Sequence, residues 1–109
     1  MADVSQVVDS VRLKAIANRL RDRYGAQRVI LFGSAARNEV TEHSDIDLLV
    51  IAVTKERFYE RMASVLATVR DLSLGMPLSP LVLTPEELAD RLGRGDQFVH
   101  EIVHDGVAL

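Results

Sequence analysis

Two aspartates and a glycine-serine pair are the residues of this sequence best suited to chemistry. Asp45 and Asp47 stand at the start of an apolar run, and Gly33-Ser34 precedes them with ten residues between. Because successive strand residues point to opposite faces, the two carboxylates should share one face, about 6.6 Å apart along the backbone. Carboxylates that point the same way repel each other, and Mg²⁺, which prefers oxygen ligands, would remove that conflict.

Gly33 and Ser34 could supply the anion-binding half of the same site. A strand that ends in Gly-Ser and enters a helix presents backbone N–H groups and a hydroxyl to an anion, and glycine lets a phosphate approach the backbone closely. Arg37 follows one turn later and could contact the same phosphates with its planar guanidinium. Each piece alone is usually an ordinary turn, a solvated strand end or a surface arginine; together they predict a metal and phosphate site for phosphoryl displacement.

The elements that must position these residues follow from hydrophobic periodicity and turn signals. The pattern predicts a helix ending before Gly25, then helices over 55–72, 84–92 and 96–105, with a shorter one over 35–40. Strands are predicted over 28–32, 45–53 and 78–83, with an edge strand at 107–109. Interleaved helices and strands predict an α/β (or α+β) fold, with a small mixed sheet flanked by helices in two layers. The length suits a single domain over residues 1–109.

The apolar positions also predict which side chains face the core. Ile46 and Leu48 should point away from the aspartates, into the interior. The capping spacing of Thr84, Pro85 and Glu87 marks a helix start. In the helix over 55–72 the expected buried side is made by Phe58, Met62, Val65, Leu66 and Val69.

Composition excludes several classes of protein. The chain has no cysteine, which excludes disulfides, thiolate zinc sites and cysteine nucleophiles. No apolar stretch approaches the ~18 residues of a membrane span, and "MADVSQVVDS" lacks a signal-peptide pattern, so we expect a soluble cytoplasmic protein without membrane contact. A net charge of −3 argues against broad nucleic-acid binding. The basic residues between 12 and 28 are interpreted as a solvated helix face, or alternatively as a surface for phosphates or an acidic partner.

The spacing of Gly33-Ser34, ten residues and "DID" resembles the signature of the nucleotidyltransferase superfamily that includes DNA polymerase beta. The short chain, "YGAQRVILFGSAARNEVTEHSDIDLLV" and the ending "FVHEIVHDGVAL" resemble the minimal nucleotidyltransferases, over nearly the whole chain from about Leu13. The resemblance implies a polymerase beta-like fold and ATP as substrate. It implies that Gly33, Ser34 and Arg37 bind the nucleotide, and that Asp45 and Asp47 bind Mg²⁺ and are catalytic.

The resemblance also implies a partner. Many members of that family are antitoxins encoded beside a HEPN-domain RNase toxin, and they inactivate it by transferring AMP from ATP to a toxin tyrosine. For this chain it therefore implies a Mg²⁺-dependent protein adenylyltransferase whose partner is a cognate HEPN toxin. The small size of the chain favours a macromolecular acceptor, because a small-molecule acceptor would need walls around it.

Two positions depart from the family pattern. Asn38 stands where glycine is frequent, although asparagine tolerates left-handed backbone better than most residues. Ser79 stands where the superfamily has a third carboxylate on the third core strand, which helps activate the attacking hydroxyl. Glu42, His43 or a group of the partner could take that role. The alternative is a weak or inactive binding module that neutralises a toxin by complex formation.

Two competing functions are disfavoured. "HEIVH", from His100 to His104, matches the H-E-x-x-H pattern of zinc proteases, but catalytic zinc needs three protein ligands and no third is evident. We expect instead a buried stripe and a solvated side, formed respectively by Phe98, Val99, Ile102 and Val103 and by His100, Glu101, His104 and Asp105. An RNA-modifying enzyme that uses the basic first helix is disfavoured by the overall acidity and the lack of interleaved aromatic residues.

Overall fold

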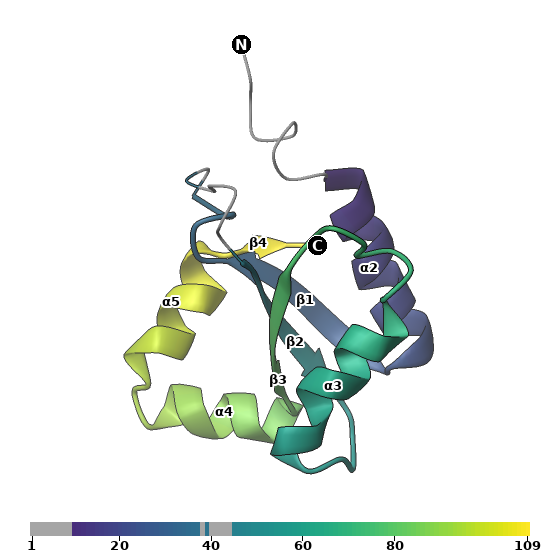
Figure 1. Cartoon of the computed structure of the whole chain (residues 1–109). Helices are drawn as coiled ribbons and strands as arrows, with labels where there is room; N and C mark the ends of the chain where they lie inside the picture. Colours follow the sequence, from purple (N-terminus) through teal and green to yellow (C-terminus); the bar gives the residue numbers. More distant parts are fainter. Residues whose placement is uncertain (1–9, 38, 40–44) are drawn as a thin grey trace.

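In the part of the chain that the structure describes, a four-stranded sheet lies between two pairs of helices (Figure 1). The computed structural model describes residues 10–37, 39 and 45–109. The elements in chain order are α2 (Ser10–Arg23), β1 (Ala26–Phe32), β2 (Ile46–Ala52), α3 (Phe58–Thr68), β3 (Leu78–Leu83), α4 (Pro85–Gly93), α5 (Gln97–Asp105) and β4 (Val107–Ala108). The predicted α/β fold with a small mixed sheet flanked by helices is confirmed. Within these ranges, none of the helices has the length and apolar character that a membrane crossing needs.

The sheet has the strand order β3-β2-β1-β4. β1 is antiparallel to both β2 and β4, whereas β2 and β3 are parallel and are joined through α3. The register pairs Asp47 with Phe32 on one side and with Ser79 on the other. Because a slip of one residue would turn Asp47 to the opposite face, this register is what positions the candidate site.

Each face of the sheet buries its own hydrophobic core. Strand β2 is apolar on both faces, as a central strand must be when helices cover it on both sides. The predicted two-layer arrangement is therefore wrong: the helices form two outer layers around the sheet. On one face α2 and α3 pack against the sheet, with a core that includes Leu13, Ile16, Leu20, Leu48, Val50 and Val65. On the other face α4 and α5 do so, with Ile30, Leu49, Ile51, Leu88, Val99 and Ile102.

Several predicted element bounds and buried positions are wrong. Residues 33–37 form turns rather than the start of a helix, and α3 covers 58–68 rather than 55–72. Phe58 and Met62 are about half exposed, so only part of the expected stripe on α3 is buried. Phe98 is also exposed, because the buried side of α5 consists of Val99 and Ile102. The short β4 occupies the predicted edge-strand position.

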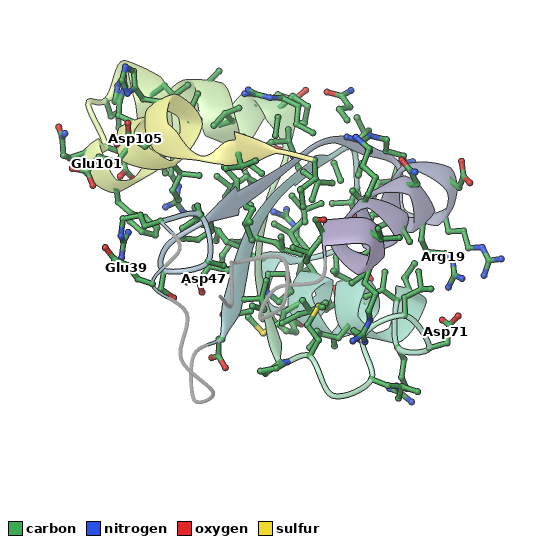
Figure 2. All side chains as sticks on the ribbon, turned by 90° about the horizontal axis from the view of Figure 1, so that it is seen from above. Arg19, Glu39, Asp47, Asp71, Glu101 and Asp105 are labelled. Atoms are coloured by element: carbon green, nitrogen blue, oxygen red, sulfur yellow. The ribbon has the colours of Figure 1, made fainter. Side chains whose placement is uncertain are left out.

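Two arginines of the basic helix α2 bind the chain itself. The Arg12 guanidinium donates to the carbonyl oxygens of Leu72, at 2.8 and 3.0 Å, and of Leu74, at 2.7 Å. Arg19 forms a bidentate ion pair with Asp71, in which the two guanidinium nitrogens lie 2.8 and 3.1 Å from the carboxylate oxygens (Figure 2). These contacts fasten the turn after α3 to α2, so part of the positive charge serves the fold.

Candidate active site

Gly33 shapes the turn that leaves β1. Its φ of +72° lies in the left-handed region, where side chains are strained. A Cβ built on Gly33 would collide with the Asp47 Oδ2 atom and stand 3.3 Å from Asp47 Cγ. The Arg37 amide closes the turn by donating to the carbonyl oxygens of Gly33, at 3.3 Å, and Ser34, at 3.2 Å. Only glycine therefore allows the Asp47 carboxylate to lie against this turn.

Asp47 is a half-buried carboxylate in the middle of the sheet. Burial raises its pKa above the ordinary value, the negative charge of Asp45 raises it further, and the positive charge of Arg37 opposes both. Figure 2 shows Asp47 on the same side of the molecule as Glu39 and the α5 carboxylates of Glu101 and Asp105. The ionised form of Asp47 is thus held in an unfavourable environment that a cation would relieve.

The donor set fits a magnesium ion that shares its coordination with a substrate. Asp45 and Asp47 offer hard carboxylate oxygens, and Mg²⁺ is usually bound by one or two carboxylates together with substrate phosphates. Among the residues that the structure describes, there is no group of three or more histidine, cysteine, aspartate or glutamate side chains suited to a metal.

Two hollows meet at Asp47. The first, which we call the α5 hollow, has a volume of about 270 Å³ and is lined by Gly33, Arg37, Asp47, Phe98, Glu101 and Asp105 among others. The second, the β3 hollow, has about 480 Å³ and is lined by residues that include Asp47, Phe58, Arg61, Met62, Ser79 and Phe98. One carboxylate thus faces both a charged recess and a largely apolar one.

The predicted site residues are brought together in part. Gly33, Arg37 and Asp47 line the α5 hollow, whereas Ser34 and Asp45 line neither hollow. Asp45 is exposed and lies one residue before β2, which begins at Ile46, so its place on the same face as Asp47 stays a prediction. The charge of Asp45 nevertheless acts on Asp47.

Three positions of the hypothesis lie outside the described residues. They are the frequent-glycine position Asn38 and the two alternative bases, Glu42 and His43.

Ser79 stands beside Asp47 in the sheet. The two are register partners on the parallel strands β2 and β3, where paired residues point to the same face, and both line the β3 hollow. The position assigned from the resemblance to the third carboxylate is therefore next to Asp47, and it carries a hydroxyl.

The two histidines of "HEIVH" are exposed together with Glu101 and Asp105, as predicted. The His100 Nε2 atom lies 3.1 Å from the Leu92 carbonyl oxygen, and the His104 Nδ1 atom lies 2.7 Å from Asp105 Oδ1. Each imidazole thus has its own protein partner.

Sequence reasoning missed Phe98, Glu101 and Asp105 as residues of the site. Their signal was present only in part, since Glu101 and Asp105 are four residues apart and so share one side of a helix. Periodicity marked that side as solvated, which is correct, but it could not show that α5 lies over the turn after β1.

Comparison with known proteins adds independent evidence. The family described as "Nucleotidyltransferase domain" matches residues 13–103. Three similar proteins come from Methanocaldococcus jannaschii. "Putative protein adenylyltransferase MJ0128" is 43% identical over 61 residues, which are 55% of this chain and 53% of that protein. "Putative protein adenylyltransferase MJ1305" is 37% identical over 67 residues (56% and 44%), and "Putative protein adenylyltransferase MJ0604" is 44% identical over 41 residues (36% and 41%). The aligned part spans about half of these relatives or less.

Proposed function

The chain belongs to the nucleotidyltransferase domain family, and from that premise we propose that it is a Mg²⁺-dependent protein adenylyltransferase. Its mixed sheet flanked by helices is the polymerase beta-like fold that the resemblance implied. The observation that carries the proposal is the shared hollow of Gly33, Arg37 and Asp47, which joins an anion-binding turn to a carboxylate. The names of the similar proteins support AMP as the transferred group and a protein as the acceptor.

Each residue has a defined task in this proposal. The turn from Gly33 to Arg37 holds the triphosphate of ATP, and the Arg37 guanidinium contacts its oxygens. Asp45 and Asp47 would hold Mg²⁺, which supplies charge neutralisation at the phosphates. The acceptor oxygen forms a bond to the α-phosphorus while the bond from that phosphorus to the leaving pyrophosphate breaks. The proton of the acceptor hydroxyl passes to a base. Ser79 cannot act as this base, so the candidates are Glu42, His43 or a group of the partner.

The acceptor in this proposal is a tyrosine of a HEPN-domain toxin, and the chain acts as its antitoxin. The resemblance supplies this partner. The surface supports a protein acceptor, because Phe58, Met62 and Phe98 expose apolar area beside Asp47. Such exposed apolar side chains next to a reactive group suit contact with a macromolecule.

The test is direct. The chain is incubated with ATP, Mg²⁺ and the protein encoded by the neighbouring gene, which is then weighed intact by mass spectrometry. We expect the neighbour to gain one or more AMP units with the wild type and none with Asp47→Asn. Asp22→Asn, an exposed aspartate of α2, is the matched control and should act as the wild type does. A neighbour of unchanged mass with the wild type would contradict the proposal.

A second candidate function is favoured by one observation. Ser79 occupies the position beside Asp47 where the superfamily has its third carboxylate, which suits a binding module that covers a toxin without modifying it. Neutralisation of the toxin that persists in Asp47→Asn, with no change in toxin mass, would establish this alternative.

A further inference from the structure

Phe98 stands between the two hollows. It is a large apolar side chain near the start of α5, yet it is 54% exposed. Its ring contacts the Phe32 ring edge-on, with the centroids 5.8 Å apart and the planes at 80°. Both rings line both hollows. Edge-to-face pairs are a preferred geometry of aromatic rings, so the contact with Phe32 favours the position of the Phe98 ring at the border of both hollows.

The two hollows differ in chemistry. The α5 hollow is lined by Arg37 and Gly33, and also by the carboxylates of Glu101 and Asp105. Arg37 and the Gly33 backbone suit phosphates, whereas the carboxylates suit the hydroxyl or amino donors of a nucleoside.

The β3 hollow offers little for a phosphate. Its walls include the apolar side chains of Phe58, Met62 and Leu81. Among the described residues that line it, the one cation is Arg61. Arg61 is buried and already engaged, since its guanidinium donates to Glu87 at 2.6 and 3.2 Å and to the Val82 carbonyl oxygen at 3.2 Å. An uncharged, apolar group is therefore the better occupant of this hollow.

We infer that Phe98 determines acceptor specificity by separating the donor nucleotide in the α5 hollow from an aromatic acceptor side chain in the β3 hollow. The inference rests on the proposed function, since it assigns the two substrates of that reaction to two places. A phenol in the β3 hollow would reach toward Asp47 with its hydroxyl while its ring contacts Phe58, Met62 and Phe98. An aliphatic hydroxyl has no ring to make these contacts, so serine would be a poorer acceptor than tyrosine.

Nuclear magnetic resonance with small probes tests this partition without relying on activity. The probes are N-acetyl-tyrosinamide, N-acetyl-serinamide, and α,β-methylene ATP with Mg²⁺. We expect the nucleotide analogue to shift the amide signals of Gly33 and Arg37, and the tyrosine derivative to shift the methyl signals of Met62 and Leu81. Both should bind at the same time, and the serine derivative should bind much more weakly than the tyrosine derivative.

Variants of Phe98 test whether its side chain separates the two binding places. Phe98→Ala should weaken binding of the tyrosine derivative about fivefold to tenfold, as expected for loss of one aromatic contact, and should weaken binding of the nucleotide analogue less than that. Phe98→Tyr, which keeps the ring, should restore the affinity. Tyr59→Ala removes another exposed ring, on α3 and outside both hollows, and should have no effect. Because Phe98 is half exposed, we expect its variants to fold. Native-like spectra of the variants will check this.

Three results would overturn the inference: competition between the tyrosine derivative and the nucleotide analogue, equal binding of the serine derivative, or unchanged affinity in Phe98→Ala. Its failure can be told from failure of the proposed function. Wild-type chain that binds both probes together but transfers no AMP would defeat the proposed function alone. Chain that transfers AMP but binds both probes in one hollow would defeat the partition alone.

Discussion

Replacing Gly33 with alanine separates two demands that the structure places on this position. One demand is the left-handed backbone, with φ +72°; the other is the space that the Asp47 carboxylate occupies. Gly75 is the matched control, because its φ is +74° and a Cβ built there meets nothing within 4 Å. Gly75→Ala therefore carries the backbone penalty alone, whereas Gly33→Ala carries it together with the collision.

The expected magnitudes follow from these two environments. Left-handed backbone costs a residue with a Cβ roughly 1–2 kcal/mol, and this should appear in both variants. Gly33→Ala should lose about 0.5–1.5 kcal/mol more, because the Asp47 side chain must leave its preferred rotamer. For a domain of this size each kcal/mol lowers the melting temperature by roughly 4–8 °C. The displaced carboxylate should also weaken binding of α,β-methylene ATP with Mg²⁺ by about tenfold, which corresponds to about 1.4 kcal/mol.

Urea unfolding and titration calorimetry measure the two effects separately. Gly75→Ala should bind the nucleotide analogue within about twofold of the wild type, as expected for a site it does not touch. In an Asp47→Ala background the carboxylate is gone, and Gly33→Ala should then cost no more stability than Gly75→Ala. Equal losses of stability and of affinity in the two single variants would refute the claim that Gly33 makes room for Asp47.

Two further predictions concern Glu87 and Ser79. Glu87 accepts the hydrogen bonds of buried Arg61, and this pairing lowers the Glu87 pKa. A carboxyl with a lowered folded pKa stabilises the protein above its unfolded pKa and loses that effect as the pH falls through the folded pKa. At pH 7 the free energy of unfolding in urea should therefore be about 1–2 kcal/mol higher for the wild type than for Glu87→Gln. The difference is smaller than for a fully buried pair, because 40% of the Glu87 side chain is exposed. The difference should shrink below about pH 4.5, the ordinary value for glutamate, and a pH-independent difference would contradict it. Ser79→Asp places a carboxylate beside Asp47 and should speed AMP transfer on the order of 10²-fold, as expected for a supplied general base. An unchanged rate in a time course of intact mass would show that the proton is taken elsewhere.

The elements could be predicted from sequence where a local signal dictates them. Thr84 and Glu87 form the predicted capping box, with Glu87 N–H donating to Thr84 Oγ1 at 3.1 Å and Thr84 N–H donating to Glu87 Oε1 at 2.8 Å. Gly25 ends α2 in the left-handed conformation that favours glycine. The apolar run from Ile46 identified a central strand, because only a strand covered on both faces can be apolar on both. All of these signals lie within a few residues of their effect.

Features that depend on distant pairing could not be predicted. The buried Arg61 pairs with Glu87, which lies 26 residues later in the chain, and on α3 alone an arginine indicates a solvated side. The position of α5 over the site depends on β4, whose Val107 and Ala108 pair with Leu31 and Ile30 of β1. Without that pairing, nothing in the periodicity of α5 distinguishes a side that faces solvent from one that faces a hollow.

The register of the sheet explains how catalysis and mere binding can differ by one side chain. Phe32, Asp47 and Ser79 lie side by side on β1, β2 and β3, so the acid at the centre has an aromatic ring on one side and a hydroxyl on the other. Ser79 lines the β3 hollow and does not belong to either hydrophobic core. A carboxylate or a hydroxyl there is therefore compatible with the same fold, and serine at this position carries no information against the fold. In the proposed reaction it changes the source of the base, which would then come from another segment or from the acceptor. If the acceptor protein supplies the base, activity should depend on which acceptor is presented. A small phenol would then bind beside Asp47 without being modified, whereas a tyrosine of the acceptor protein would be modified.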